Sequence, residues 1–282
     1  MKVVPWLAIL TIGVPLAIAQ QDLGNSKLPV ATQWTLDAAG PTQRSAIRSV
    51  VLLYCPLTNK KGTGFVLKNG LIVTNNHVVE GCTVERLQGV TSGGEAVVFR
   101  KMATDPDVDL AALRPTEALK GGLELADAKD PDLGMAVSTW GYPLIYNGPA
   151  PLLSVGYVAG FSEDVSNGKR VKHLVINGAF NPGNSGGPLF KANDNKVIGV
   201  VVAKFHLYPP IVRNAIEALA RNKTGVVYTA TDPQGNQKSF AESEIVAMVL
   251  DQYYTFTQVM IGEAISVSEV RAFLKAHEME LR

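Results

Sequence analysis

The chain has 282 residues, enough for one large or two small domains, and 46% of them are hydrophobic, which supplies ample material for a folded core. Its formal net charge is only +1, and no tract of basic residues interleaved with aromatics occurs along it. Composition therefore gives no sign of a nucleic acid or of an anionic membrane surface as a partner.

The first residues have the pattern of a secretory signal. Met1 and Lys2 make a short positive start, a mostly apolar run from Val3 to Ala19 follows, and Ala17-Ile18-Ala19 forms a small-x-small cleavage site. We expect residues 1–19 to be a signal peptide, cleaved after Ala19, and the protein to be secreted or periplasmic. The alternative is an uncleaved anchor, because a run of this length is close to the lower limit for spanning a bilayer, and only then would the protein contact a membrane.

After this leader, the segment from Gln20 to Arg44 is polar and contains glycine and proline, which predicts a loosely held tail over residues 20–44. Further on, glycine, proline, asparagine and aspartate cut the chain into short β-rich runs, a pattern typical of a barrel or a sandwich. The predicted strands are Val50–Tyr54, Thr63–Leu67, Leu71–Val73, Ala96–Arg100, Leu110–Leu113, Ala136–Trp140, Leu152–Val158, Lys172–Ile176 and Val197–Ala203. A polar, breaker-rich stretch from Pro115 to Leu133 marks the expected boundary between two halves.

A serine lies inside a glycine-rich turn of the second half, in the sequence Phe180-Asn181-Pro182-Gly183-Asn184-Ser185-Gly186-Gly187-Pro188. Glycines let a backbone turn tightly and approach a substrate carbonyl closely. In that geometry the amides of Gly183 and Ser185 can face the oxygen of a tetrahedral intermediate and form an oxyanion hole. The segment therefore predicts that Ser185 is a nucleophile.

A serine nucleophile needs a base, and a histidine and an aspartate occur in suitable settings upstream. His77 follows an apolar strand in Thr74-Asn75-Asn76-His77-Val78-Val79, and Asp109 stands directly before the apolar run Leu110–Leu113. Taken singly, each has an ordinary interpretation as a satisfied side chain, a cap or a turn residue. Together, in the order His77, Asp109, Ser185, they predict a catalytic triad. The other histidines, His173, His206 and His277, lack an acidic partner pattern or metal spacing, so we expect no metal site.

With the blocks T-N-N-H-V-V, D-x-D-L-A-x-L and G-N-S-G-G-P, the chain resembles the trypsin-like serine peptidases of the chymotrypsin fold (clan PA), and among them the bacterial HtrA/Deg-like branch. The resemblance runs from about Ser49 to Leu274. It implies an all-β fold of two packed six-stranded antiparallel β-barrels, with His77 and Asp109 in residues 45–125 and Ser185 in residues 126–282. It also implies hydrolysis of peptide bonds in proteins or peptides through an acyl-enzyme on Ser185, with no metal and no organic cofactor.

The resemblance also bears on specificity. In trypsin-type members an aspartate at the base of the specificity pocket pairs with Arg or Lys, but here Ala179 takes that position, beside Phe180. The facing strand, Val200-Val201-Val202, is uncharged as well. Because a cationic side chain would lack a partner in such a pocket, we expect small or medium apolar residues on the acyl side of the scissile bond.

Two further expectations follow from the resemblance. Family members often tie their first strands to the segment behind the catalytic histidine with a disulfide, which Cys55 and Cys82 would permit, and two buried free thiols are the alternative.

Digestive-type members have Asp where this chain has Asn184, and that carboxylate pairs with a new amino terminus after zymogen cleavage. A neutral Asn cannot form the ion pair, so we expect competence without such a cut.

The main departure from the family is an insertion over residues 206–257. It predicts a helix around Ile211–Ala220, a strand at Val226–Ala230, a turn at Asp232–Asn236 and a second helix from about Ala241 to Tyr253. A surface elaboration and a border of the substrate cleft are both open as its role. A C-terminal helix is expected from Ser266 to Glu278, with Ser266 and Glu269 at capping-box spacing, and it leaves no room for the PDZ module of many HtrA-like proteins.

Two other functions stay open. Gly183–Gly187 also fits G-x-S-x-G, the nucleophile elbow of α/β-hydrolase esterases and lipases, for which Asp251 and His277 would supply acid and base. The breakers around the motif argue against the strand and helix that an elbow requires. The other possibility is a catalytically silent binding protein on a protease scaffold, since a collapsed oxyanion hole leaves no trace in the sequence.

Overall fold

The computed structural model describes residues 28–144, 146–192, 194–202, 210–231, 236–256 and 261–278. The expected signal peptide at residues 1–19 lies outside them. The helices are α1 (Val30–Ala38), α2 (Pro41–Ser49), α3 (Asn76–Val79), α4 (Pro210–Asn222), α5 (Glu242–Phe256) and α6 (Val267–Ala276). The strands are β1 (Val50–Cys55), β2 (Lys60–Val66), β3 (Ile72–Thr74), β4 (Gln88–Thr91), β5 (Ala96–Val97), β6 (Phe99–Asp105), β7 (Leu110–Pro115), β8 (Glu124–Leu125), β9 (Ala136–Gly141), β10 (Leu152–Ser166), β11 (Lys169–Gly178), β12 (Pro188–Lys191), β13 (Lys196–Val202), β14 (Val227–Thr231), β15 (Gln237–Ala241) and β16 (Gly262–Ser266).

The N-terminal half is one curved sheet of seven antiparallel strands in the order β5-β4-β1-β2-β3-β7-β6. Its two end strands, β5 and β6, follow each other in the chain with only Val98 between them. The run Ala96–Arg100, expected as one strand, is therefore split at Val98, whose side chain is 62% exposed. Side chains such as Leu53, Phe65, Ile72 and Leu113 are fully buried in this half.

The C-terminal half is a closed barrel. Strands follow one another in the order β12-β9-β10-β11-β16-β13, and β13 pairs back onto β12, so the ring has six antiparallel strands. The short strand β8 adds to β13 in parallel. The all-β class with two packed β-structures is confirmed, but only the C-terminal one is the six-stranded closed barrel that we expected, because the N-terminal sheet has seven strands and open ends.

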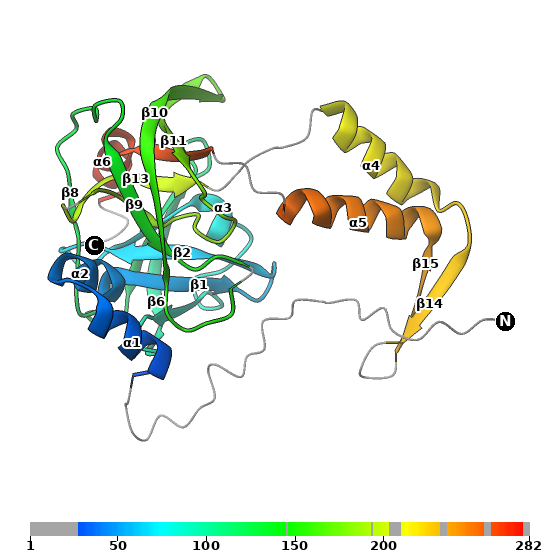
Figure 1. Ribbon diagram of the computed structural model, residues 1–282, viewed down its shortest axis with the longest axis horizontal. Coiled ribbons are helices and arrows are strands. Elements are labelled where there is room, and N and C mark those ends of the chain that lie inside the picture. The colour runs from blue at the N-terminus through cyan, green and yellow to red at the C-terminus, as the bar shows by residue number, and fades with distance from the viewer. Residues whose placement is uncertain are drawn as a thin grey trace.

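The segment before β1 is more ordered than its composition predicted. Residues 30–49 form α1 and α2 rather than a loosely held tail (Figure 1). Thr32 and Leu36, one turn apart on α1, are buried, as is Ile47 on α2. Arg44 Nε also donates a hydrogen bond to Leu36 O at 2.8 Å, which fixes the two helices to each other. A narrow stripe of buried side chains thus anchors a segment that also exposes apolar side chains such as Trp34.

The insertion forms a unit of its own beside the barrels. Helices α4 and α5 pack against each other, and the β14–β15 hairpin connects them (Figure 1). Figure 1 shows this unit extending to one side of the two β-structures, and both interpretations of its role stay open. The expected helices and strand are confirmed, while Asp232–Gly235 of the expected turn lie outside the described residues.

Helix α6 follows β16 directly, close to the expected position. Its expected capping box is wrong: Ser266 makes no side-chain cap bond, and its hydroxyl bonds Ser268 Oγ at 2.6 Å. Glu269 Oε1 instead accepts the N–H of Lys172 at 3.4 Å, so tertiary packing takes the carboxylate that the cap would need. None of the described helices is long and apolar enough to cross a lipid bilayer.

Candidate active site

His77 and Asp109 lie together in the N-terminal half. His77 is on the single-turn helix α3, and its Nδ1 lies 2.7 Å from Asp109 Oδ2. The other carboxylate oxygen accepts the backbone N–H of His77 at 2.9 Å. One carboxylate oxygen of Asp109 therefore bonds the ring of His77, and the other bonds its backbone. The two side chains are 21% and 17% exposed, so the pair sits at the surface of a packed region rather than deep inside it.

The backbone of Asp109 is unusual, since its φ of 57° is left-handed, a conformation that few residues other than glycine adopt. The turn before it is held by Asp105, whose Oδ1 accepts the N–H groups of Asp107 at 3.0 Å and Val108 at 3.2 Å. The carbonyl of Asp109 in turn accepts the N–H of Asn76 at 3.1 Å and Asn75 Nδ2 at 3.0 Å. These bonds fix the strained residue against the helix that carries His77.

Ser185 reaches the same place from the C-terminal barrel. It is 4% exposed, and its carbonyl accepts the N–H of Thr63 at 2.9 Å. The next residue, Gly186, has a φ of 82°, and a side chain there would collide with Thr63 O and Thr74 Oγ1 and would lie 3.0 Å from Asn75 N. The serine turn is thus pressed against the chain segment that leads into His77, which places the three expected triad residues in one region.

The backbone around Ser185 is oriented by hydrogen bonds. The carbonyl of Pro182 accepts the N–H of Leu144 at 2.8 Å, and the carbonyl of Asn184 accepts the N–H of Gly187 at 2.9 Å. Because C=O and N–H of a trans peptide point in opposite directions, the N–H of Gly183 points away from Leu144 and that of Ser185 away from Gly187. Gly183 has a φ of 97°, and a Cβ there would lie 2.7 Å from Leu144 N, so the position requires glycine.

Asn184, between the two amides, is fully buried. Its Nδ2 is 3.5 Å from Ser154 Oγ, a weak contact, and its Oδ1 has no hydrogen-bond partner among the described residues. The amide at this position carries no charge that could pair with a new amino terminus, and competence without a cut stays a prediction.

Two residues that the sequence did not single out, Lys61 and Thr63, contact the serine turn or the loop behind it. Lys61 Nζ donates to Tyr146 O at 3.2 Å and to Pro143 O at 3.4 Å, and burial lowers the pKa of this lysine. The hydroxyl of Thr63 donates to Gly183 O at 2.7 Å. The sequence predicted a strand at Thr63–Leu67 but not these contacts, because the partners of Lys61 and Thr63 lie far along the chain.

The expected specificity residues fall into two groups. Phe180 is 8% exposed and lies in one apolar cluster with Val201, whereas Val200 and Val202 belong to another cluster with Trp140. This division follows from the alternation of side chains along β13. The Phe180 ring packs against Gly262, where an added Cβ would lie 2.6 Å from it. Ala179 beside it is half-buried. The structure therefore groups Phe180 and Val201 but not all five residues.

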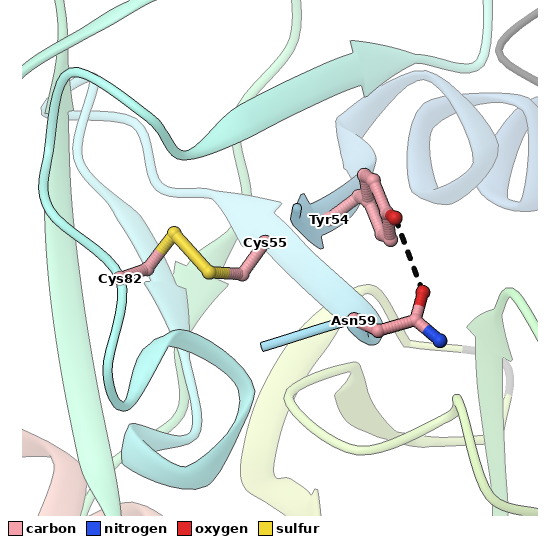
Figure 2. The surroundings of a disulfide bond; sticks show 4 residues. All are labelled: Tyr54, Cys55, Asn59 and Cys82. Carbon is pink, nitrogen blue, oxygen red and sulfur yellow. Dashed lines mark hydrogen bonds between the residues drawn. A yellow bond between two sulfur atoms is a disulfide. The ribbon is translucent and has the colours of Figure 1, made fainter. Parts of the chain in front are cut away.

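A disulfide joins Cys55 and Cys82, with the Cα atoms 5.8 Å apart (Figure 2). Cys55 ends β1, and Cys82 follows α3 by three residues, so the bond anchors the chain just after His77. At the same end of β1, the hydroxyl of Tyr54 donates to Asn59 Oδ1 at 3.1 Å, as Figure 2 shows. The alternative, in which Cys55 and Cys82 are buried free thiols, is therefore wrong.

The residues of the esterase alternative do not assemble around Ser185. His277 is at the end of α6, where its Nδ1 bonds Phe273 O at 3.0 Å, and Asp251 is on α5 in the insertion. The chain after Ser185 turns into strand β12, not into the helix of a nucleophile elbow. Of the other histidines, His173 is buried with Nδ1 at 3.2 Å from Val171 O, and His206 lies outside the described residues.

Comparison with known proteins agrees with this geometry. Residues 62–200 match the trypsin-like peptidase domain. This part of the chain is a trypsin-like peptidase domain. The range starts next to Thr63 in β2, ends in β13 and includes His77, Asp109 and Ser185.

Curated relatives match about half of the chain. A protein of Bartonella henselae named as a probable periplasmic serine endoprotease, DegP-like, is 34% identical over 146 residues, which are 51% of this chain and 28% of that protein. An uncharacterized protein of Sinorhizobium fredii, y4bJ, is 35% identical over 148 residues, which are 51% of this chain and 22% of that protein. The chain thus spans about a quarter of the length of these relatives.

Solved structures share the fold of the trypsin-like domain over most of the chain. The active form of the Rv3671c protease from M. tuberculosis superposes with a TM-score of 0.55 at 20% identity, covering 89% of this chain and 87% of the other. The HtrA-type protease AlgW, with a tripeptide, gives a TM-score of 0.55 at 17% identity, covering 84% of this chain and 62% of the other.

Proposed function

We propose that the protein is a serine endopeptidase that hydrolyses peptide bonds through an acyl-enzyme on Ser185. One observation carries the proposal: Asp109 holds both the ring and the backbone of His77, and the turn of Ser185 is packed against the segment that leads into this residue. The left-handed Asp109, held in this way, favours an intact acid–base pair over a silent scaffold.

In the proposed mechanism each member of the triad has a role that is compatible with its position. Asp109 accepts the Nδ1–H of His77, which leaves Nε2 as the ring atom able to take the hydroxyl proton of Ser185. The Ser185 oxygen then attacks the peptide carbonyl, and His77 passes the proton to the leaving amine. Water, deprotonated by the same histidine, releases the acyl group in the second half of the reaction.

The backbone supplies the electrostatic part of the mechanism. The amides of Gly183 and Ser185 are the expected oxyanion donors, and the bonds from Leu144 to Pro182 and from Gly187 to Asn184 support their orientation. Such donors act mainly on the charge that develops in the transition state, where one donor contributes roughly 10²- to 10³-fold in rate.

The apolar cluster of Phe180 and Val201 supports a preference for small or medium apolar residues on the acyl side of the scissile bond. Phe180 packs against Gly262, and we expect its ring to limit the size of the side chain that fits beside it. Substrates are proteins or peptides, and we propose that they are met outside the cytoplasm, in agreement with the leader and with relatives named as periplasmic. The proposed chemistry needs no cofactor, and an uncleaved leader is the condition for contact with a membrane.

A fluorophosphonate probe tests the proposal. Wild-type protein should be labelled on the peptide that contains Ser185, as read by mass spectrometry, and should cleave an apolar peptide library. Ser185→Ala and His77→Ala should both lose cleavage while keeping their melting temperature, because members of one catalytic unit fail together. Ser239→Ala, an exposed serine on β15, is the matched control and should stay active. Labelling that persists in Ser185→Ala, or loss of activity in His277→Ala alone, would refute the assignment.

A further inference from the structure

Thr63 occupies the junction between the two halves of the molecule. It lies in β2, is fully buried, and has a backbone and a side chain that both bond outside their own sheet ladder. Its hydroxyl donates to Gly183 O at 2.7 Å and accepts the N–H of Tyr142 at 3.0 Å. Its N–H donates to Ser185 O at 2.9 Å. One residue of the N-terminal sheet thus bonds three residues of the C-terminal barrel.

The third polar group of Thr63, its carbonyl, bonds to the strand that leads to His77. This carbonyl accepts the hydroxyl of Thr74 at 2.7 Å, and Thr74 is the last residue of β3, three positions before His77. Thr74 is also fully buried. A buried row of hydrogen bonds therefore connects the strand that precedes His77 to the turn that carries Ser185.

The hydroxyl of Thr63 acts on one particular peptide plane. The carbonyl that it bonds belongs to the peptide between Gly183 and Asn184, which lies between the two peptides that carry the oxyanion amides. Those two are held from other sides, by Leu144 and by Gly187. Rotation of the middle peptide would turn both neighbours, and glycine at 183 offers little resistance to such rotation. Two hydrogen bonds oppose it: the N–H of Asn184 donates to Asn181 O at 2.9 Å within the turn, and the Thr63 hydroxyl holds the Gly183 carbonyl from the N-terminal sheet.

We propose that Thr63 is a positioning residue whose hydroxyl holds the Gly183–Asn184 peptide so that the amides of Gly183 and Ser185 face the oxyanion. This inference rests on the proposed peptidase function and assigns to Thr63 a role that acts through the backbone, not on the substrate. Without the hydroxyl, the Gly183 carbonyl and the Tyr142 N–H would both be left buried and unpaired. The turn would relieve that cost by rotating the peptide.

Three variants test the role of the hydroxyl. Thr63→Val keeps the shape and removes the hydroxyl, and Thr63→Ser keeps the hydroxyl and removes a methyl group. The matched control is Thr139→Val on β9, because Thr139 is fully buried and its hydroxyl has no partner among the described residues. If the valine variant of Thr63 does not fold, Thr63→Ala, which adds no volume, takes its place in the same comparison.

Kinetics should separate positioning from packing. We expect kcat to fall about 10- to 100-fold in Thr63→Val with KM changed less than about threefold, since an oxyanion donor acts in the transition state and not in substrate binding. Thr63→Ser should keep at least about a third of the wild-type kcat, and Thr139→Val should match the wild type. Affinity for a peptide boronic acid, whose tetrahedral adduct places an oxygen in the hole, should fall in parallel with kcat/KM.

Two outcomes would overturn the proposal: a folded Thr63→Val protein with wild-type kcat, or a Thr63→Ser protein as impaired as the valine variant. Amide NMR gives a readout that does not depend on activity. The Gly183 and Ser185 resonances should shift in Thr63→Val and stay in place in Thr139→Val, and unchanged resonances would also overturn it. If the peptidase assignment itself were wrong, wild-type protein would be neither labelled nor active, whereas the NMR comparison would still decide the role of Thr63 in the turn.

Discussion

Lys169 Nζ lies 2.7 Å from Asp105 Oδ2, and this contact ties the long β10–β11 hairpin of the C-terminal barrel to the turn that presents Asp109. Two more bonds support it, from Ser166 Oγ at 2.9 Å and Asn167 Nδ2 at 2.7 Å to Asp107 Oδ1. These three contacts, which we call the clasp, hold the tip of the hairpin against the turn that begins at Asp105, four residues before Asp109.

The clasp predicts separate effects for its two ends. Asp105→Ala removes both the contact to Lys169 and the bonds that shape the turn, so kcat should fall about tenfold as Asp109 loses its left-handed conformation. Lys169→Met removes only a half-exposed ion pair, which contributes about 0–1 kcal/mol, and should keep wild-type kcat. Equal losses in both variants would show that the ion pair, not the turn, positions Asp109. Steady-state kinetics on one peptide substrate measures the difference.

The clasp also predicts a pH dependence. Partial burial raises the pKa of Asp105, but the hydrogen bond and charge of Lys169 and the N–H groups of Val108 and Asp107 outweigh it and lower the pKa below its ordinary value of 3.8. A carboxyl group with a lowered pKa stabilises the fold above its unfolded pKa, and this stabilisation is lost as the pH falls from about 4 through the folded pKa. In urea titrations below about pH 4, Asp105→Asn should lose less unfolding free energy than the wild type. Asp132→Asn, at an exposed position, should follow the wild type, and a wild-type slope in Asp105→Asn would contradict the prediction.

Reduction of the disulfide should destabilise the protein. Cys55 and Cys82 are 27 residues apart, a loop for which the chain-entropy model gives about 3–4 kcal/mol. For a chain of this size, that corresponds to a melting temperature lowered by roughly 10 °C. Calorimetry with and without a reductant measures it, and the double variant Cys55→Ala, Cys82→Ala should melt at the reduced temperature and no longer respond to reductant. A response to reductant in that variant would place the effect elsewhere.

Asn184→Asp should be harmful in a pH-dependent way. At this fully buried position the Asn184 side chain bonds only Ser154 Oγ and no cation among the described residues, so we expect a loss of about 3 kcal/mol at pH 8 for the carboxylate. Burial raises the pKa of such a carboxyl group, and stability should therefore return as the pH falls and the group takes up a proton. Urea titrations at pH 8 and pH 5 measure both effects.

Activity should not depend on where the amino terminus begins. Wild-type protein beginning at Gln20 and versions extended before it should be comparably active, and strict dependence on a cut near Arg44 or Arg48 would contradict this.

Phe180 should limit the size of the acyl-side residue. Phe180→Val opens space beside Gly262, so the ratio of kcat/KM for a substrate with Phe to one with Ala at that position should rise at least about tenfold. Leu189→Val is the control, because it removes volume from the same apolar cluster on β12. A peptide-library profile of the wild type dominated by Arg, Lys or Glu would refute the pocket interpretation and leave the triad untouched.

The positions of the candidate triad residues could be predicted because each lies in a short pattern of consecutive residues. Asn75-Asn76-His77 and the Gly183–Pro188 turn are short local patterns, and local patterns survive without knowledge of the fold. Strands bounded by glycine or proline were predictable for the same reason. Strand β4 was missed because Gln88-Gly89-Val90-Thr91 has little apolar character, and β12 because it starts at a proline.

The rest depends on contacts between distant residues. Thr63 looks like any small strand residue, and only the approach of Gly183 and Tyr142, both far along the chain, reveals its bonds. The helices α1 and α2 were hidden by polar composition, since their anchor is a stripe of few residues that includes Leu36 and Ile47. The division of Phe180 and Val201 from Val200 likewise follows from the barrel and cannot be read from a row of valines.

The insertion leaves the barrel after Val202 and returns before Gly262, and these two ends are neighbours, because Val202 pairs with Glu263 across β13 and β16. The insertion therefore connects two neighbouring antiparallel strands, β13 and β16, as the loop of a β-hairpin would. The entropy of closing a connection grows slowly, by about 0.6 kcal/mol for each doubling of length, so the sheet is nearly indifferent to what it contains. Evolution, or an engineer, can therefore exchange this cassette for another sequence, and with it any recognition that it carries, without rebuilding the catalytic half of the molecule.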